Sequence, residues 1–565
     1  MRMGAAVCGL RLLGLLVSLL ALLLALPAAA AAESYNESLR LRALPGGRVH
    51  ATFAFELASD AASLHHFRVL PRALVQPVAS LGVHELQLSL NAGRWQYAQW
   101  GTPAPAPGGG DEEAVASGAE AWALLDNTTS PSPAERWQVL TSALASQFCV
   151  SLDAFAHDGY ATPHYDYFSS TPSQDTHLLH AYLPSEAVCT ENLSPLLALL
   201  PCKGGAGLAS LIQAHTVAGA EFHGVSVSVR RGEHGWRVRL GVQAVMQGGD
   251  SWTLSSLFKR ELRAACPVAK QSTIEVLGPP RMAVSGAGGP AEPREDLWDE
   301  EEEPPQATRH VVHTDELLAT DTGLTASTVG APVEVAKPPL LATRALLGYG
   351  QERNVVRLTL RNQLPHETVH MMYYDQLPWF AQPLLHTVHA EAAVDEFDEA
   401  DDVVRYRDDV APTFIASAHY VPPARRRRPS VLELELRVPA ASTLTVTYTL
   451  VKQVLHYDEH VPDPHRGLDL PPPMFVPLAR PLVEHERRPR TWAAAHARSP
   501  AAVAQPARMY AAPTLLDMAV PDFSMPYNVI LFYSTFVALF FGSMLNVMVR
   551  VFRDVYVEQK RDAVK

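Results

Sequence analysis

The sequence predicts a mainly β fold, in which antiparallel, sandwich-like domains with a few helices precede one transmembrane helix near the C-terminus. Many short segments alternate apolar and polar residues with a period of two, which is the pattern of half-buried strands. Turn-forming residues separate these segments at the spacing typical of an antiparallel sandwich or barrel. The last apolar run, from Val529 to Val549, has no charged residue and about the 20 residues that a helix needs to cross a bilayer.

The N-terminal segment has the composition of a signal peptide. Arg2 and Arg11 accompany an apolar run from Leu12 to Leu26, and Pro27 then leads into an alanine run that ends at Ala32. A basic start, an apolar middle and small residues at the end are typical of a cleaved secretory signal. We therefore expect this segment to be removed from the mature chain, and a retained anchor is the alternative.

Strands and one clear helix follow in the N-terminal half. The helix has a complete start signal, with Ser132 as N-cap, Pro133 at its first position and Glu135 completing a capping box. Two alternating segments are expected to pair across the turn from Gly232 to Gly235. The apolar positions of these strands and of the helix are Val49, Ala51, Phe53, Phe55, Leu86, Leu88, Leu90, Trp137, Leu140, Leu144, Phe148, Val225, Val227, Val229, Trp236, Val238 and Leu240.

Strands resume after a Gly/Pro-rich and then acidic stretch from Ser285 to Gln306, which is expected to be disordered because it cannot bury enough apolar surface. The segment after the turn from Pro439 to Ser442 is expected to be a strand that pairs with the strand before it. Arg425 to Arg428 lies between prolines, and a solvated loop is favoured over a protease site or a basic patch. The apolar positions of these strands are Val356, Leu358, Leu360, Leu432, Leu434, Leu436, Val438, Leu444, Val446, Tyr448 and Leu450.

Basic residues set the expected topology. Arg550 and Arg553 directly follow the apolar run, so the positive-inside rule puts the short tail in the cytosol and everything before the span on the far side. This is the arrangement of a type I membrane protein. The expected parts are a signal peptide (1–32), an N-terminal β-rich lumenal domain (33–284), an acidic Pro/Gly-rich linker (285–335), a second β-sandwich-like lumenal domain (336–470), a juxtamembrane stalk (471–526), a transmembrane helix (527–549) and a cytosolic tail (550–565).

Charge and cysteine content narrow the function. A net charge of −13 argues against a nucleic-acid-binding surface. After removal of the signal, four cysteines remain on the oxidising side, which is too few for a disulfide-rich scaffold, and from the residues alone they could form two internal disulfides. Three glycosylation sequons, which begin at Asn36, Asn127 and Asn192, suit a secretory-pathway chain. The four cysteines are Cys149, Cys189, Cys202 and Cys266.

No catalytic, metal-binding or cofactor motif appears in the sequence. The metalloprotease, nucleophile-elbow and phosphate-loop patterns are all missing, as is a C-x-x-C pair. His157, His164 and Asp166 could ligate zinc in principle, but such proximities arise by chance among 23 histidines. Cys149 ends an amphipathic helix and is interpreted as a buried small hydrophobic residue rather than a nucleophile. The residues alone therefore predict a β-rich, non-catalytic ectodomain without a cofactor or a metal.

Two motifs are the most specific in the sequence, the junction Asp522–Ile530, which enters the apolar run, and Cys189–Pro195, with Leu200–Cys202 close behind. Together with several other stretches they resemble the PIG-T family, whose members are subunits of the GPI transamidase of the endoplasmic reticulum. The resemblance extends over most of the chain between residues 40 and 550, with departures at 285–306, at the arginine run and at 476–512. The other matching stretches are His66–Leu74, Trp95, Trp100–Gly101, Gly348–Gly350, Leu377–Trp379 and Pro462–Pro464.

The resemblance implies a component that holds an enzyme and has no catalytic residues of its own. In the transamidase, a caspase-like subunit removes a C-terminal signal peptide from a proprotein and joins the new carboxyl end to the ethanolamine amine of a GPI lipid. The PIG-T-like subunit clamps and stabilises that enzyme and helps shape the lumenal substrate site. The implied partners are therefore the caspase-like subunit, multi-spanning subunits, the proprotein and the GPI lipid, in the endoplasmic reticulum membrane.

The resemblance also assigns roles to cysteines. Cys189 occupies the position of the family's cysteine that joins the caspase-like subunit through an intermolecular disulfide. Of the three cysteines then left, Cys202 and Cys266 are expected to pair, with Cys149 buried. In the membrane helix, small and polar residues are where another helix can approach closely, so we expect a face for the multi-spanning subunits at Gly542, Ser543 and Asn546.

Two other classes of function compete with this interpretation. A type I adhesion or receptor ectodomain that binds a glycan or protein ligand would carry repeat domains with their own disulfides and a tail with signalling motifs, and this sequence has neither. A hydrolase would need an activated nucleophile, for which no motif is present.

Overall fold

The computed structural model describes most of the 565-residue chain. The described residues are 33–60, 68–103, 115–127, 130–152, 159–165, 176–186, 188–232, 235–279, 282–285, 308–319, 323–328, 333, 338–348, 350–394, 405–407, 414–461, 463–478, 508–520 and 524–551. The predicted signal peptide, most of the acidic stretch and nearly all of the cytosolic tail lie outside them.

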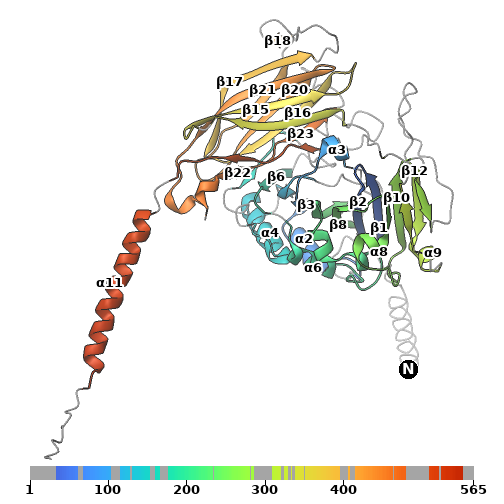
Figure 1. Cartoon of the computed structure of the whole chain (residues 1–565), viewed down its shortest axis with the longest axis horizontal. Coiled ribbons are helices and arrows are strands. Elements are labelled where there is room, and N and C mark those ends of the chain that lie inside the picture. Colours follow the sequence, from blue (N-terminus) through green and yellow to red (C-terminus); the bar gives the residue numbers. More distant parts are fainter. Residues whose placement is uncertain are drawn as a thin grey trace, which may run out of the picture.

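A ten-stranded sheet forms the centre of the N-terminal domain (Figure 1). Its strand order is β12-β10-β1-β2-β8-β7-β3-β4-β6-β5, and within the described residues its strand pairs are antiparallel except β1 with β10. The predicted pairing across Gly232–Gly235 is confirmed as β7 with β8. The strands are β1 (Glu33–Leu44), β2 (Arg48–Ser59), β3 (Val83–Ala92), β4 (Gly118–Asp126), β5 (Tyr160–Ala161), β6 (Thr176–Leu183), β7 (Phe222–Gly232), β8 (Gly235–Gln247), β10 (Gln271–Gly278) and β12 (Thr308–His313).

Helices cover one face of this sheet and form the main core with it (Figure 1). The predicted capping box at Ser132 is confirmed, and the apolar face of its helix is buried from Trp137 to Phe148. A small sheet of β9 (Ser251–Thr253), β11 (Ala283–Ser285) and β13 (Thr325–Ser327) completes the domain. Its helices are α2 (Arg72–Ser80), α3 (Tyr97–Trp100), α4 (Pro133–Phe148), α6 (Thr190–Ala198), η1 (Leu208–Leu211), α7 (Ala214–Ala218), α8 (Leu254–Phe258) and α9 (Thr314–Ala319).

The other face of the sheet is polar but also buried. The alternation in β2 predicts a half-buried strand, yet His50 and Thr52 on its polar side are both nearly inaccessible to solvent. The indole ring of Trp95 packs edge-on against the ring of His50, with ring centroids 4.9 Å apart. A loop and part of the second domain thus cover this face, which the period-two pattern cannot reveal.

Two five-stranded sheets form the second domain (Figure 1). The segments on either side of Pro439–Ser442 are strands, as predicted, but they lie in different sheets instead of pairing with each other. One sheet contains β14 (Leu340–Leu347), β15 (Arg353–Asn362), β17 (Ala381–Val394), β18 (Arg405–Arg407) and β21 (Ser442–Lys452). The other contains β16 (Val369–Leu377), β19 (Ile415–Val421), β20 (Ser430–Val438), β23 (Met474–Leu478) and β24 (Met509–Tyr510), and a separate pair joins β22 (Leu468–Leu470) to β25 (Thr514–Leu516).

A buried ion pair lies in the core of this sandwich. Nη1 of Arg344 donates to both carboxylate oxygens of Asp375, at 2.9 and 3.0 Å, and both side chains are fully buried. The hydroxyl groups of Tyr373 and Tyr448 also donate to this carboxylate. Arg344 reaches the carbonyl of Pro471 as well, so the network fastens the chain beyond β22 to the sandwich.

Parts of the predicted linker and stalk belong to these sheets. Residues 308–313 form β12 on the edge of the ten-stranded sheet, and residues 325–327 form β13. In the predicted stalk, β23 and β24 pair with the second domain's sheet, and β25 pairs with β22. We therefore propose domain boundaries of 33–328 and 338–520 instead of those expected from composition.

The last helix, α11 (Ser524–Val549), extends away from both domains (Figure 1). Tyr527–Val549 is long and apolar enough to cross a membrane, with a mean hydropathy of 1.8. These are the bounds predicted for the transmembrane helix.

Candidate functional site

The exposed thiol of Cys189 stands at the start of α6 and is the best-defined candidate site. Its backbone is extended, and the next residue, Thr190, opens the helix. The backbone N–H of Cys189 donates to Oδ1 of Asn192 at 2.6 Å. Within the described residues the thiol has no disulfide partner. A free sulfur is thus held at the surface by the first turn of a helix.

Asn192 connects this helix start to the end of α4. Its Nδ2 donates to the carbonyl oxygens of Phe148, at 2.7 Å, and Cys149, at 3.3 Å. The side chain is buried, as are Leu193 and Leu196 in the same helix. Because one amide satisfies backbone groups of both helix ends, the start of α6 is fixed relative to α4.

Cys149 carries the second free thiol of the described residues, and it is exposed. The expectation that it is a buried small hydrophobic residue is therefore wrong. It follows the last helical residue, Phe148, which takes the buried position, and its left-handed backbone (φ 55°) ends the helix. We call Cys149, Cys189 and the bridging Asn192 the thiol shelf.

The three sequons lie in different environments. Asn127 is exposed directly after β4, and Asn36 is half-buried within β1. Asn192 is 1% exposed, and both ends of its amide are engaged in the thiol shelf. The structure thus argues against the expected glycan at Asn192, because attachment would need an accessible Nδ2.

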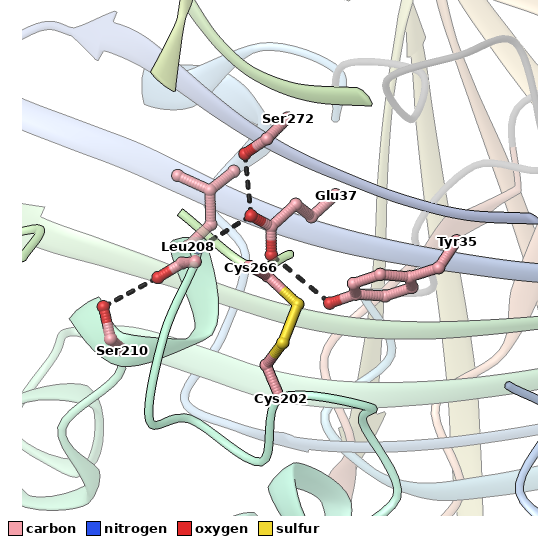
Figure 2. Close-up of a disulfide and its surroundings, with 8 residues drawn as sticks. Tyr35, Glu37, Cys202, Leu208, Ser210, Cys266 and Ser272 are labelled. Atoms are coloured by element: carbon pink, nitrogen blue, oxygen red, sulfur yellow. Dashed lines mark hydrogen bonds between the residues drawn. A yellow bond between two sulfur atoms is a disulfide. The ribbon is translucent and has the colours of Figure 1, made fainter. Parts of the chain in front are cut away.

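A disulfide fixes the chain that follows α6 (Figure 2). Cys202 is bonded to Cys266, with their Cα atoms 6.1 Å apart. This bond joins the segment after α6 to the segment after α8, 64 residues further along the chain. The asparagine bridge and the disulfide therefore restrain the chain on both sides of α6.

The carboxylate of Glu37 lies beside this disulfide and is buried (Figure 2). It accepts hydrogen bonds from the hydroxyl of Ser272 at 2.7 Å, the backbone N–H of Leu208 at 3.2 Å and the hydroxyl of Tyr35 at 3.3 Å. Burial raises the pKa of Glu37, although these neutral donors oppose the shift. Its hydrogen-bond donors among the described residues are all neutral, so the region around the disulfide is a neutral polar network.

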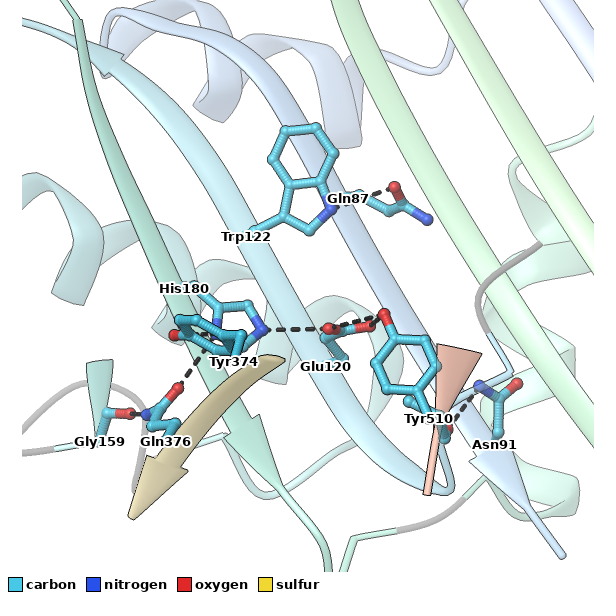
Figure 3. A network of polar contacts seen from close by, with 10 residues as sticks. Gln87, Asn91, Glu120, Trp122, Gly159, His180, Tyr374, Gln376 and Tyr510 are labelled. Carbon is cyan, nitrogen blue, oxygen red and sulfur yellow. Dashed lines mark hydrogen bonds and ion pairs between the residues drawn. The ribbon is translucent and has the colours of Figure 1, made fainter. Parts of the chain in front are cut away.

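The junction between the two domains holds a second buried network (Figure 3). His180 Nε2 and Glu120 Oε1 are 3.0 Å apart, and both residues belong to the N-terminal sheet. From the second domain, the hydroxyl of Tyr510 donates to both oxygens of Glu120, at 3.0 and 3.1 Å. His180 Nδ1 lies 3.0 Å from the hydroxyl of Tyr374 and 3.0 Å from Oε1 of Gln376.

Charge stabilises this junction. Burial alone would raise the pKa of Glu120, but the hydrogen bond and charge of His180, with the charge of Arg508, lower it overall. Burial also raises the pKa of Tyr374 and Tyr510, so both phenols keep their protons. The two domains are therefore joined by an ionised carboxylate whose partners come from both of them.

A second contact between the domains involves His164. Its backbone N–H donates to Oε1 of Glu433 at 3.0 Å, and its ring stacks on His419 with centroids 4.0 Å apart. Among the described residues no group of three or more metal-ligating side chains forms, which leaves the zinc alternative for His157, His164 and Asp166 untested. His157 and Asp166 lie outside the described part of the chain.

The residues expected to contact multi-spanning subunits lie on α11. Gly542, Ser543 and Asn546 are exposed along it. A Cβ added at Gly542 would meet nothing within 4 Å. The hydroxyl of Ser543 donates a hydrogen bond to the carbonyl of Phe540. Nothing in the described chain occupies this helix face.

Sequence reasoning missed the junction residues. Glu120 is the only charged residue between Gly118 and Leu125, and His180 interrupts a largely apolar strand. A lone polar residue inside an apolar strand signals a buried partner, because buried polar groups are nearly always hydrogen-bonded. The partner itself, Tyr510, lies 390 residues away and has no local signal.

The fold and the site together define a protein with two β-rich domains, a helix able to cross a membrane and a fixed, exposed thiol. The described residues contain no group of metal-ligating side chains. A family model described as "Gpi16 subunit, GPI transamidase component" matches residues 19–247 and 242–565, so the chain belongs to this family of GPI transamidase components.

The relatives in curated collections carry matching names. The GPI-anchor transamidase component PIGT of Mus musculus is 29% identical over 92% of this chain and 90% of its own length. The human protein of the same name is 28% identical over 94% of this chain and 92% of its length. The GPI transamidase component GPI16 of Saccharomyces cerevisiae is 25% identical over 93% and 89%.

Among solved structures, the collagen binding domain of the Erysipelothrix rhusiopathiae surface protein RspB matches over 80% of this chain and 85% of its own. Its sequence identity is 7% and its TM-score is 0.17, so the likeness carries no argument about fold or function.

Proposed function

We propose that this GPI transamidase component is a non-catalytic subunit that clamps and stabilises a caspase-like catalytic subunit. The observation that carries the proposal is the thiol shelf, which presents Cys189 at the surface on a helix start fixed by Asn192. Cys189 forms an intermolecular disulfide with the catalytic subunit, and the ectodomain helps to shape the lumenal site where proproteins meet the GPI lipid.

The rigidity of the shelf supports this role. A thiol on a mobile loop would place its partner loosely, whereas Cys189 precedes a helix that packs its leucines into the core. A covalent bond between subunits keeps their surfaces at a high effective concentration when the noncovalent contact opens. The bond thus reinforces assembly and does not take part in the reaction.

The proposed topology is single-pass type I in the endoplasmic reticulum membrane. The ectodomain lies in the lumen, α11 crosses the bilayer and the basic tail faces the cytosol. Asn127 carries a glycan because its side chain is exposed, and Asn36 is the second candidate. Protease added to sealed microsomes should remove the tail and leave the ectodomain, and digestion of the ectodomain would contradict this orientation.

Helix α11 is proposed to contact the multi-spanning subunits through Gly542, Ser543 and Asn546. Lipid offers no hydrophobic drive between helices, so small residues that allow close approach must provide the contact. Replacement of the span by a poly-leucine helix should weaken co-purification of those subunits. Unchanged co-purification would refute this role for the helix.

The direct test of the proposed function is a pull-down of the full chain in mild detergent, followed by mass spectrometry. We expect recovery of a caspase-like protein together with multi-spanning membrane proteins. Recovery of the chain as a monomer, or with cell-surface ligands, would favour an adhesion or receptor ectodomain instead.

A further inference from the structure

The segment between β21 and β22 begins and ends beside the chain's exit toward α11. At its start, Nζ of Lys452 donates to the carbonyl of Asp517 and, at 2.8 Å, to that of Gly350. At its end, a Cβ added at Gly467 would lie 2.6 Å from the carbonyl oxygen of Leu516. Both ends therefore touch the residues that follow β25. In Figure 1 this orange segment lies beside the upper end of α11.

Strand direction indicates which way the segment projects. β22 and β25 are antiparallel, with Leu468 opposite Leu516. The chain leaves Leu516 toward α11, so the residues just before Leu468 extend in the same direction. Ser524, the first residue of α11, lies seven positions after Asp517, a distance of at most about 25 Å when the chain is fully extended. The segment 453–467 is thus close to the membrane surface whenever α11 crosses the bilayer.

This segment exposes apolar side chains on the surface of the described chain. Val454 is 76% exposed and Tyr457 is 55% exposed, and Val461 is also exposed. Leu515, in the neighbouring β25, adds a fourth exposed apolar side chain, whereas Leu516 beside it is buried. Scattered apolar residues are ordinary on a protein surface, but apolar residues gathered next to a membrane span are not.

Arginines flank this apolar group. The guanidinium of Arg426 forms an ion pair with Glu459, at the end of η2 (Tyr457–Glu459), and lies over the ring of Trp379 at 4.8 Å from its centroid. These contacts hold the turn of residues 425–428 against the segment 453–467. The other three arginines of the turn, Arg425, Arg427 and Arg428, have exposed side chains.

We propose that these residues form a membrane-docking surface that rests on the phospholipid bilayer around α11. The surface comprises Val454, Tyr457, Val461 and Leu515, with Arg425, Arg427 and Arg428 at its edge. The apolar side chains enter the boundary between headgroups and acyl chains, the tyrosine hydroxyl stays at headgroup level, and the arginines bind lipid phosphates. With α11 as one anchor, this second contact sets the tilt of the ectodomain above the membrane.

The bilayer fits better than a soluble ligand for two reasons. The four apolar side chains are exposed on the surface, which suits a group that enters lipid more than one that encloses a small molecule. Two carboxylates of this region are paired, Glu459 with Arg426 and Asp469 with Arg466, so the three exposed arginines outnumber the two exposed carboxylates of the segment, Asp458 and Asp463.

The test uses the full chain in nanodiscs of phosphatidylcholine with phosphatidylserine and a phospholipid that carries a photoreactive diazirine high on one acyl chain. After irradiation, mass spectrometry locates the lipid adducts. We expect adducts on 453–467 and on α11, with at least about fivefold fewer on α4, which belongs to the N-terminal domain. Val139 in α4 is the matched control, because it is 55% exposed, as is Tyr457.

Two variants sharpen the test. Val454→Asp with Tyr457→Asp should reduce adducts on 453–467 to the level of α4 while those on α11 persist, which shows that the chain is still inserted. Replacement of Arg425, Arg427 and Arg428 by glutamine should reduce adducts more in discs with phosphatidylserine than in discs of phosphatidylcholine alone. Wild-type adducts on 453–467 no more abundant than on α4 would overturn the proposal.

The same experiment on the assembled complex distinguishes lipid from protein. If 453–467 loses its lipid adducts there and cross-links to another subunit, the surface is a subunit interface and the proposal is wrong. The nanodisc result depends on α11 crossing the bilayer but not on any transamidase partner. Failure of the pull-down above would therefore refute the proposed function and leave this surface intact.

Discussion

Glu37 and Glu120 are both buried carboxylates of the same ten-stranded sheet, yet their pKa values shift in opposite directions. Glu37, beside the disulfide, is surrounded by neutral donors, and its pKa is raised by burial. Glu120, at the domain junction, has His180 and Arg508 as neighbours, and its pKa is lowered. The hydrogen-bond donors of Glu37 come from its own domain, whereas Tyr510 and Arg508 approach Glu120 from the second domain.

This difference shows how the two regions are built. The region around Glu37 and the Cys202–Cys266 disulfide is held by that disulfide and by neutral hydrogen bonds from the N-terminal domain itself. The junction is a charged network that is complete only when the second domain is in place. Movements between the domains are therefore expected to leave the thiol shelf unchanged and to disrupt the hydrogen bonds of the junction.

The largest expected effect comes from His180→Ala. This variant leaves the carboxylate of Glu120 buried without its histidine partner, and breaking a buried pair in this way costs about 3–5 kcal/mol. Denaturant unfolding of the purified chain should show the loss, and hydrogen exchange should rise in β16 and β24. His177→Ala is the matched control on the same strand, because His177 is exposed. Equal stability of the two variants would contradict the proposed role of the junction.

The second-largest effect is expected from Gly207→Ala, which should destabilise the neutral network around Glu37. Gly207 has a positive φ of 70°, and an added Cβ would lie 2.5 Å from the carboxylate oxygens of Glu37 and 2.9 Å from Cβ of Cys266. We expect a loss of about 1–3 kcal/mol, which a fall in Tm would report. Gly249→Ala isolates the contact from the backbone strain, since Gly249 has φ of 73° but nothing within 4 Å. If both variants lose the same stability, the close approach at Glu37 contributes nothing.

Asn192→Ala should act locally on the thiol shelf. It removes the acceptor for the Cys189 amide and the donor to the ends of α4, at a cost of about 1–3 kcal/mol. Hydrogen exchange should increase at 188–193 with little change elsewhere. Ser194→Ala removes the same sequon but leaves these bonds intact, and it should change neither exchange nor gel mobility. A mobility increase in Ser194→Ala would indicate a glycan at Asn192 and contradict the buried geometry.

The smallest effects are pH-dependent and have opposite signs. The pKa of Glu120 is lowered below its ordinary value of 4.5, so its stabilising contribution is present above pH 4.5 and is lost as the pH falls further. The pKa of Glu37 is raised above 4.5, so its folded form is favoured at low pH and loses stability as the pH rises through the shifted value. Unfolding free energies of Glu120→Gln and Glu37→Gln, compared with the wild type from pH 3 to 8, should therefore diverge in opposite directions. Parallel curves would contradict the assigned shifts.

Local signals in the sequence predicted much of the fold. The capping box at Ser132 and the period-two strands depend on neighbouring residues alone, and they are confirmed. The partner of each strand depends on residues far away, which is why the predicted neighbour of the strand after Pro439–Ser442 is wrong. For the same reason composition predicts a linker where the structure has β12 and β13, since each pairs with a strand from elsewhere in the chain.

In the candidate site, too, the local sequence predicts some features and the folded chain decides the others. The motif at Cys189 identified the residue, but the exposure of Cys149 depends on where α4 ends relative to α6. The sequon at Asn192 suggested a glycan because a triplet carries no information about burial. Its actual contacts, with carbonyls 43 and 44 residues away, appear only in the folded chain.

The central claim is that the thiol shelf links this subunit covalently to its enzyme through Cys189. The most direct measurement is a non-reducing gel of the complex from cells that express the wild type, Cys189→Ser or Cys149→Ser. The Cys149 variant is the matched control, because its thiol is also free, exposed and part of the shelf. We predict a heavier species in the wild type and in Cys149→Ser that collapses with reductant and is absent in Cys189→Ser. A heavy species that survives in Cys189→Ser but disappears in Cys149→Ser would contradict the account.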